Sequence, residues 1–248
     1  MQKPEEDGDM PQQGVALIVR PEFDTATKYG NYYMGVAANY AKNKIILGDL
    51  SGPDATKNNI NTALSEFDPI LCFFLGHGNS DVYTCQNQEV YMQTCFGNEV
   101  MQNRNLILLS CSCGIRLGPD TANKGAKAVH CWAVDFIWVA SGDPPDDYSK
   151  GYFEAVNEIW YAHVDGYLPK EAHDRSIAIW NKWIDYWIQS DDEYASLIVQ
   201  HMINDRDGQR LYGVGDVPSV PVPGVELLSR IELPMILGET LLFLSMIA

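Results

Sequence analysis

Two apolar segments of this sequence each end at a side chain that could take part in covalent catalysis. Residues 71–75 are followed by a glycine and then His77, and residues 106–109 are followed by a serine and then Cys111. An imidazole next to a thiol can accept its proton, and the thiolate then attacks a carbonyl carbon. The sequence therefore predicts Cys111 as a nucleophile and His77 as its general base, provided that the fold brings the two segments together.

Strand-like and helix-like patterns alternate along most of the chain, which predicts the elements that would position these side chains. The predicted strands are 14–20, 45–47, 70–76, 105–110, 126–132 and 209–213, and the predicted helices are 25–42, 52–67, 118–125, 149–164 and 170–188. This order predicts an α/β fold, a three-layer α/β/α sandwich around a mostly parallel sheet of about six strands. In such a sheet the carboxyl ends of neighbouring strands share one crevice, where His77 and Cys111 would meet.

Smaller features complete the predicted architecture. Residues 82–85 and 89–92 predict a hairpin outside the main sheet, and residues 205–208 predict a turn. Asp54 and Thr56 are both suitable caps for the second helix. An apolar stripe at helical spacing predicts core or interface packing for the last long helix: Ile177, Trp180, Trp183, Ile184 and Trp187.

A second thiol, Cys113, is the alternative nucleophile. A small residue precedes each of the two cysteines, but a glycine, Gly114, stands three residues after Cys111 and directly after Cys113. Cys111 also lies closer to the end of the predicted strand, so it is the preferred nucleophile. The remaining histidines are expected to be structural or surface residues: His130, His163, His173 and His201.

The charge balance excludes some classes of partner. Acidic residues outnumber basic ones by 33 to 17, for a net charge of −16. Binding to nucleic acid requires clustered lysine and arginine, so we expect no nucleic-acid partner. The acidic loops at 143–147 and 191–193 could hold calcium, but they match no calcium-loop template, so no cofactor and no metal is predicted.

The cysteines and the two ends of the chain indicate its compartment and the bounds of its domain. Six cysteines show no metal-ligand spacing, and Cys85 and Cys95 would pair only in an oxidising compartment, so a cytoplasmic location is expected. Residues 1–13 predict a disordered acidic lead-in with no signal-peptide pattern. Residues 14–218 predict one domain. The apolar tail at 219–248 carries too many charges for a transmembrane segment and is expected to pack on the body, mediate self-association or inhibit the site.

The two motifs together resemble those of the caspase-like cysteine peptidases (clan CD). The resemblance rests on Gly76-His77-Gly78 after one apolar run and on Ser110-Cys111, followed by Gly114, after the next. Residues 118–129 and 211–218 are similar to elements of the gingipain-like branch, close to the CHAT domains. The resemblance implies a cysteine endopeptidase that hydrolyses a polypeptide substrate through a Cys111–His77 dyad and an acyl-enzyme.

The remaining site residues follow from this mechanism and from the resemblance. The backbone N–H groups of Gly78 and Cys111 are suited to an oxyanion hole, because glycine lets the substrate approach the chain closely. The family places its primary specificity pocket after the first and fifth strands, which here implies Arg20, Glu22, Asp24, Trp132 and Asp135. A carboxylate there, Asp135 first and Asp24 next, would select a basic residue, whereas Arg20 would favour an acidic one; all of them could also be solvated loop charges.

Two other functions compete with peptide hydrolysis. A catalytically silent caspase-like module could bind a peptide or a protein partner through its tryptophan-rich helices and apolar tail. A thiol redox protein is disfavoured, because Cys111-Ser112-Cys113 lacks the two-residue spacing of the usual Cys-x-x-Cys motif.

Overall fold

The computed structural model describes residues 15–213 and 242–245. The predictions for 1–13, for the proline-containing connector at 217–223 and for most of the tail lie outside the described residues. None of the described helices is long and apolar enough to cross a membrane.

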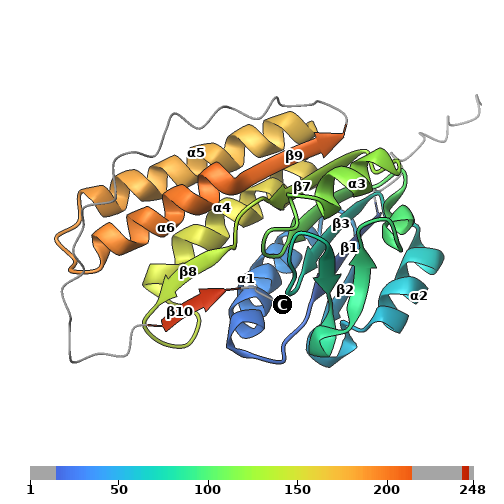
Figure 1. The fold of residues 1–248 in the computed structure, drawn as a ribbon, viewed down its shortest axis with the longest axis horizontal. Coiled ribbons are helices and arrows are strands. Elements are labelled where there is room, and N and C mark those ends of the chain that lie inside the picture. The colour runs from blue at the N-terminus through green and yellow to red at the C-terminus, as the bar shows by residue number, and fades with distance from the viewer. Residues whose placement is uncertain (1–14, 214–241, 246–248) are drawn as a thin grey trace, which may run out of the picture.

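A six-stranded sheet forms the centre of the protein, with the strand order β2-β1-β3-β6-β7-β9 (Figure 1). The first five of these strands are parallel to their neighbours, and β9 is antiparallel to β7. The strands are β1 (Val15–Arg20), β2 (Ile46–Ser51), β3 (Leu71–Leu75), β6 (Asn105–Leu109), β7 (Ala128–Trp132) and β9 (Gln209–Gly213). The mostly parallel α/β sheet predicted from the sequence is confirmed.

Helices cover both faces of this sheet. The helices are α1 (Thr25–Ala41), α2 (Lys57–Phe67), α3 (Leu117–Asn123), α4 (Asp147–Val164), α5 (Pro169–Ile188) and α6 (Ala195–Gly208). Side chains of β1 alternate between two separate hydrophobic clusters, because successive side chains of a strand point to opposite faces. Ala16 and Ile18 pack with α1, α4, α5 and α6, and Leu17 and Val19 pack with α2 and α3. We call these the α1 face and the α2 face.

Short elements lie outside the central sheet. The strands β4 (Val82–Thr84) and β5 (Val90–Gln93) form the predicted hairpin, and β8 (Ile137–Ala140) pairs with β10 (Leu242–Ser245). Three 3₁₀ turns are η1 (Gly52–Asp54), η2 (Gln86–Gln88) and η3 (Asn98–Met101). Thr56, one of the two predicted caps, is the N-cap of α2 and accepts a hydrogen bond from Asn59 N.

The predicted turn at 205–208 is wrong, since these residues form the last turn of α6. Asp205 explains the error, because an acidic residue on the core-facing side of a helix interrupts the apolar pattern that would predict it. It is fully buried, and burial raises its pKa well above the ordinary value. Its Oδ1 accepts hydrogen bonds from Ile137 N and from the side chain of Asn204. The α5 stripe, by contrast, packs in the core as predicted, with Trp180 fully buried.

The six cysteines all lie within the described residues, and none of them forms a disulfide. Cys95 is exposed, whereas the other five are buried. The sulfur of Cys85 contacts the backbone oxygen of Glu89 at 3.4 Å. The hairpin between Cys85 and Cys95 is therefore formed without a bond between them.

Candidate active site

His77 and Cys111 follow two strands that are direct neighbours in the sheet. β3 pairs with β6 in parallel, with Leu75 opposite Leu109. The pairing continues past the strand ends, because Gly76 N donates to Leu109 O at 3.2 Å. His77 and Cys111 each stand two residues beyond the last pair of this register, at the ends of neighbouring strands, which lie about 4.8 Å apart where they pair.

The two candidate nucleophiles lie on opposite faces of the sheet. Cys111 belongs to the hydrophobic cluster of the α1 face, together with Trp132 and Phe136. Cys113 belongs to the cluster of the α2 face, next to Cys131, and its sulfur lies 3.2 Å from Ser110 O. Because Asp24, the partner of His77, lies at the start of α1, the imidazole and Cys111 share one face and Cys113 does not.

The imidazole of His77 is held by a carboxylate. His77 Nε2 lies 2.5 Å from Asp24 Oδ2, and the ring of Phe23 lies 5.5 Å from the imidazole ring, centroid to centroid. Burial raises the pKa of Asp24, but hydrogen bonds from the Thr27 backbone and from His77 outweigh it and lower that pKa below 3.8. His77 Nδ1 is buried and has no hydrogen-bond partner among the described residues.

The thiol of Cys111 is buried between backbone groups of the segment that follows β7. Phe136 N donates to Cys111 Sγ at 3.2 Å, and the thiol faces Phe136 O at 3.8 Å. None of the Cys111 surface is exposed. The sulfur therefore both accepts a hydrogen bond from this backbone unit and faces its carbonyl oxygen. Access to the sulfur requires the Phe136 segment or a neighbouring segment to move.

The backbone after Cys111 turns sharply. Ser112 has φ = 54°, a left-handed conformation that is uncommon for a residue other than glycine. Its N–H donates to Val134 O at 2.8 Å, and Gly114 N donates to Trp132 O at 2.7 Å. These bonds tie the turn to the end of β7, so the position of Cys111 is fixed from both sides.

Gly78 packs against the residue that precedes Cys111. A Cβ atom at Gly78 would overlap Ser110 Oγ and would lie 2.5 Å from Val82 O. Glycine is therefore required here by close approach of the two strand ends. The N–H groups of Gly78 and Cys111, the predicted oxyanion-hole donors, accordingly belong to adjacent segments at the same edge of the sheet.

The predicted specificity residues occupy different surroundings. Asp135 is partly exposed and accepts a hydrogen bond at 2.7 Å from Oγ of Ser112, the residue between Cys111 and Cys113. Arg20 forms a two-pronged ion pair with Asp49 at 2.8 and 3.0 Å. Glu22 is exposed, and its backbone N–H bonds Gln86.

Trp132 is fully buried and packs edge-to-face on Phe136 at 5.3 Å. Its indole Nε1 has no hydrogen-bond partner among the described residues. The structure thus groups Asp24, Trp132 and Asp135 around His77 and Cys111, whereas the charge of Arg20 is compensated within the fold.

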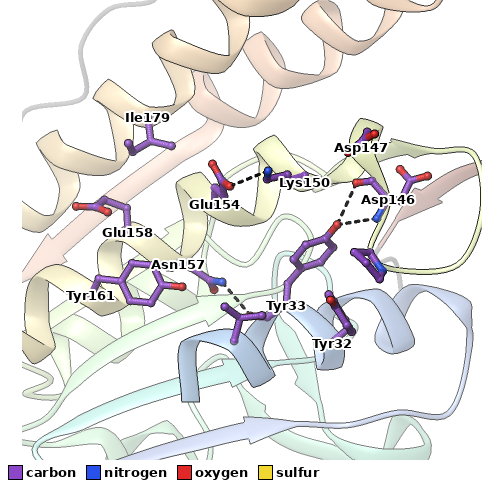
Figure 2. Close-up of a pocket in the computed structure, with 12 residues that line it drawn as sticks. Tyr32, Tyr33, Asp146, Asp147, Lys150, Glu154, Asn157, Glu158, Tyr161 and Ile179 are labelled. Carbon is purple, nitrogen blue, oxygen red and sulfur yellow. Dashed lines mark hydrogen bonds and ion pairs between the residues drawn. The ribbon is translucent and has the colours of Figure 1, made fainter. Parts of the chain in front are cut away.

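A cavity of about 450 Å³ opens elsewhere, between α1 and α4 (Figure 2). Neither His77 nor Cys111 lines it. The Tyr33 hydroxyl contacts the backbone of Asp146, and Glu154 accepts a hydrogen bond from the Trp183 indole outside the cavity wall. Glu158 pairs with Arg175 at 2.6 Å. The acidic groups of this cavity are thus engaged mainly by residues outside its wall, and no cysteine or serine among the described residues lines it.

The other histidines and the acidic loops have structural partners. His130 Nε2 lies 3.0 Å from His163 Nε2, and burial lowers the pKa of His163 to about 4. Asp146 caps α4, and Asp143 pairs with Lys28. Among the described residues, no group of three or more histidines, cysteines and acidic residues could hold a metal ion.

The Asp24–His77 contact and the role of Phe136 are not evident from the sequence. Asp24 was expected to line a pocket, and its position directly before a helix signalled only an N-cap. Phe136 contacts the sulfur through backbone atoms, which leave no trace in a side-chain pattern. The apolar run at 137–140 was the available signal for β8.

The comparisons with known proteins find no match, either among models of protein families or among curated sequences. The fold and the site define an α/β protein with a mixed, mostly parallel six-stranded sheet and a histidine and a cysteine at the carboxyl ends of adjacent strands.

Proposed function

We propose that this protein is a cysteine endopeptidase, as the resemblance of its motifs to the caspase-like peptidases implies. One observation carries the proposal. His77 and Cys111 follow β3 and β6, which pair in register, and Asp24 holds one nitrogen of the imidazole while the other has no partner among the described residues. A base that is oriented by a third group and lies on the same face of the sheet as a thiol can activate that thiol when the two come into contact.

The tautomer of His77 follows from its partner. A carboxylate can only accept, so Asp24 takes the hydrogen on Nε2 and leaves the lone pair on Nδ1. Nδ1 would then take the proton of Cys111, and the thiolate would attack the scissile carbonyl. The imidazolium would return the proton to the leaving amine, and a water molecule would hydrolyse the acyl-enzyme.

The turn at Gly78 and Cys111 would bind the oxygen of the tetrahedral intermediate. Backbone N–H groups serve this purpose well, since they are fixed before the reaction and need no reorganisation. The close approach of Gly78 to Ser110 holds these two segments at a constant separation.

Asp135 is the best-placed residue to select a basic side chain before the scissile bond. It is partly exposed and lies next to Phe136. Among the described residues it forms no ion pair. A carboxylate facing the substrate would pair with arginine or lysine. Arg20 is already paired with Asp49, which disfavours selection of an acidic residue by its guanidinium.

A panel of fluorogenic peptides that differ in the residue before the scissile bond tests the proposal. Wild type, Cys111→Ala, His77→Ala and Cys113→Ala would be compared. Loss of hydrolysis in the first two variants and its retention in Cys113→Ala is the expected result. Cys113→Ala is the matched control, because it removes a neighbouring buried thiol from the other face of the sheet. Hydrolysis that survives in Cys111→Ala would overturn the proposal.

The burial of Cys111 favours a second candidate, a catalytically silent module that binds a peptide or protein partner. A thiol with no exposed surface cannot meet a substrate without rearrangement. Iodoacetamide distinguishes the two functions, because an activated thiol reacts well below pH 8.5 whereas an unactivated one does not. Absence of both hydrolysis and fast alkylation would favour the binding module.

A further inference from the structure

The strand β8 leads directly away from the candidate nucleophile. It begins at Ile137, one residue after Phe136, whose backbone N–H and C=O lie 3.2 and 3.8 Å from Cys111 Sγ. β8 is not part of the six-stranded sheet, and among the described residues its strand partner is β10. The edge of such a strand binds extended peptides, since its backbone groups pair with an added strand.

The C-terminal strand occupies this edge with a defined direction. β10 is antiparallel to β8, with Leu242 opposite Ala140 and Ser245 opposite Ile137. The chain of β10 therefore runs towards the end of β8 that adjoins Phe136 and Cys111. Figure 1 shows β10, in red, beside β8 and near α1, the helix whose first turn carries Asp24.

A substrate on the same edge would have the same direction. Its residues before the scissile bond must lead up to Cys111, because the carbonyl that the sulfur attacks belongs to the last of them. A peptide that is antiparallel to β8 meets this condition, since its carboxyl-directed end reaches the Phe136 end of the strand. β10 thus has the position and the direction of the acyl side of a bound substrate.

We propose that residues 242–245 are an intramolecular pseudosubstrate, which occupies the edge of β8 where the acyl side of a substrate peptide pairs and must leave before a substrate binds. This inference rests on the proposed peptidase function. Cys111 and His77 are 0% and 4% exposed in this arrangement, so a substrate can reach them only after a segment has moved. Pairing of two short strands is only marginally stable by itself, so β10 can be displaced without unfolding the sheet.

Proline substitutions in the full chain test whether β10 covers the site. Consecutive residues of a strand direct their N–H groups to opposite edges, so one residue of the pair Phe243 and Leu244 donates towards β8. Proline has no N–H, and one of Phe243→Pro and Leu244→Pro must therefore remove a bond to β8. Phe243→Ala and Leu244→Ala are the matched controls, because they shorten the side chain and keep the N–H.

Two measurements are made on each variant, after circular dichroism has shown that it is folded. The first is the rate at which iodoacetamide modifies Cys111, followed by peptide mass spectrometry, and the second is hydrolysis of the fluorogenic panel. Loss of one strand hydrogen bond is expected to raise alkylation of Cys111 about fivefold in at least one proline variant, relative to its alanine control. Hydrolysis should rise with it, and a synthetic peptide with the sequence of residues 240–248 should inhibit the activated variant.

The outcomes separate this inference from the peptidase proposal. Unchanged alkylation and hydrolysis in all four folded variants would overturn the inference, and dependence of wild-type hydrolysis on Cys111 would still support a peptidase. Faster alkylation without hydrolysis of any peptide would overturn the peptidase proposal and the pseudosubstrate role with it, leaving β10 as a cover for the thiol. Wild-type alkylation that accelerates on dilution would assign the strand to a second copy of the chain and overturn the intramolecular contact.

Discussion

The carboxylate of Asp24 lies 2.5 Å from Nε2 of His77 and so connects the first turn of α1 to the end of β3. Since the folded-state pKa of Asp24 is below 3.8, the carboxylate is ionised at neutral pH. A carboxyl group with a lowered pKa stabilises the fold fully above its unfolded value, and this stability is lost as the pH falls through the folded value. The contact with His77 therefore persists throughout the neutral and mildly acidic range.

Asp24→Asn is predicted to reduce kcat by about a hundredfold or more while leaving KM nearly unchanged, because the amide no longer fixes the tautomer of His77. Asp24 also accepts a hydrogen bond from Thr27 N at 2.8 Å as the N-cap of α1. Asparagine caps helices as well as aspartate does, so the N-cap of α1 should be kept. Asp24→Ala should lose both activity and about 1 kcal/mol of stability. Equal kcat for wild type and Asp24→Asn would contradict a positioning role.

Asp135→Asn is predicted to lower kcat/KM for peptides with arginine or lysine before the scissile bond, with little change for neutral peptides. The loss of a charge-assisted contact corresponds to about tenfold or more. Ser112 Oγ can still bond the remaining amide oxygen, so the turn at Cys111 should be preserved. Asp143→Asn is the control, since it removes an exposed acidic charge that pairs with Lys28. A proportional loss for every peptide would assign Asp135 a structural role.

The cysteines of the folded protein are predicted to react with iodoacetamide in a fixed order, with Cys95 first because it is the exposed one. Burial raises the pKa of Cys72 to about 12 and that of Cys85 to about 11, so their thiolates are scarce at neutral pH. Burial also raises the pKa of Cys131. Peptide mass spectrometry at pH 7 would reveal the order. Modification of Cys72 before Cys95 would contradict the described packing.

The central sheet could be predicted because its signals are local. Runs such as 71–75 and 105–109 are continuously apolar, since both faces of a parallel strand are covered. The pairing of His77 with Cys111 followed from the positions of these runs. The preference for Cys111 over Cys113 rested on spacing. Two residues of an extended chain separated by one residue would share a face, so the different faces of Cys111 and Cys113 result from the turn at Ser112, whose φ is 54°.

Other parts of the site depend on contacts between residues distant in sequence. Asp24 and His77 are 53 residues apart, and no pattern in either segment identifies the other as its partner. The pairing of β8 with β10 joins residues about a hundred positions apart through backbone groups alone. The helix α6 was missed because Asp205 interrupts its apolar face, although its carboxyl group has hydrogen-bond donors in the fold.

The unfolding free energy is predicted to fall on acidification below pH 6.5, because buried histidines must stay neutral. Burial lowers the pKa of His163 to about 4 and lowers those of His130 and His173 as well. The unfolded chain takes up these protons more readily, so stability is full above pH 6.5 and declines as the pH approaches 4. His163→Gln should remove on the order of 2 kcal/mol of this decline. Urea unfolding at several pH values measures this decline. An equal decline of the unfolding free energy in wild type and in His163→Gln would contradict the assignment.

Gly78→Ala is predicted to destabilise the protein by about 1–3 kcal/mol and to abolish hydrolysis, because its Cβ would force apart the segments that carry His77 and Cys111. The added atom would overlap Ser110 Oγ and approach Val82 O within 2.5 Å. Ser110 Oγ is itself buried without a hydrogen-bond partner among the described residues. Ser110→Ala alone should therefore be neutral or slightly stabilising, since it removes a buried hydroxyl that makes no bond.

The double variant Gly78→Ala/Ser110→Ala distinguishes a local clash from a general loss of backbone freedom. Removing the hydroxyl makes room for the new methyl group on one side, so the double variant should be more stable than Gly78→Ala, with a coupling energy of about 1 kcal/mol. The stability of the double variant should still be below that of wild type, because the new methyl group remains too close to the backbone oxygen of Val82. Additive effects of the two substitutions on urea unfolding would show that Gly78 and Ser110 are not in contact and would remove the support for a rigid oxyanion site.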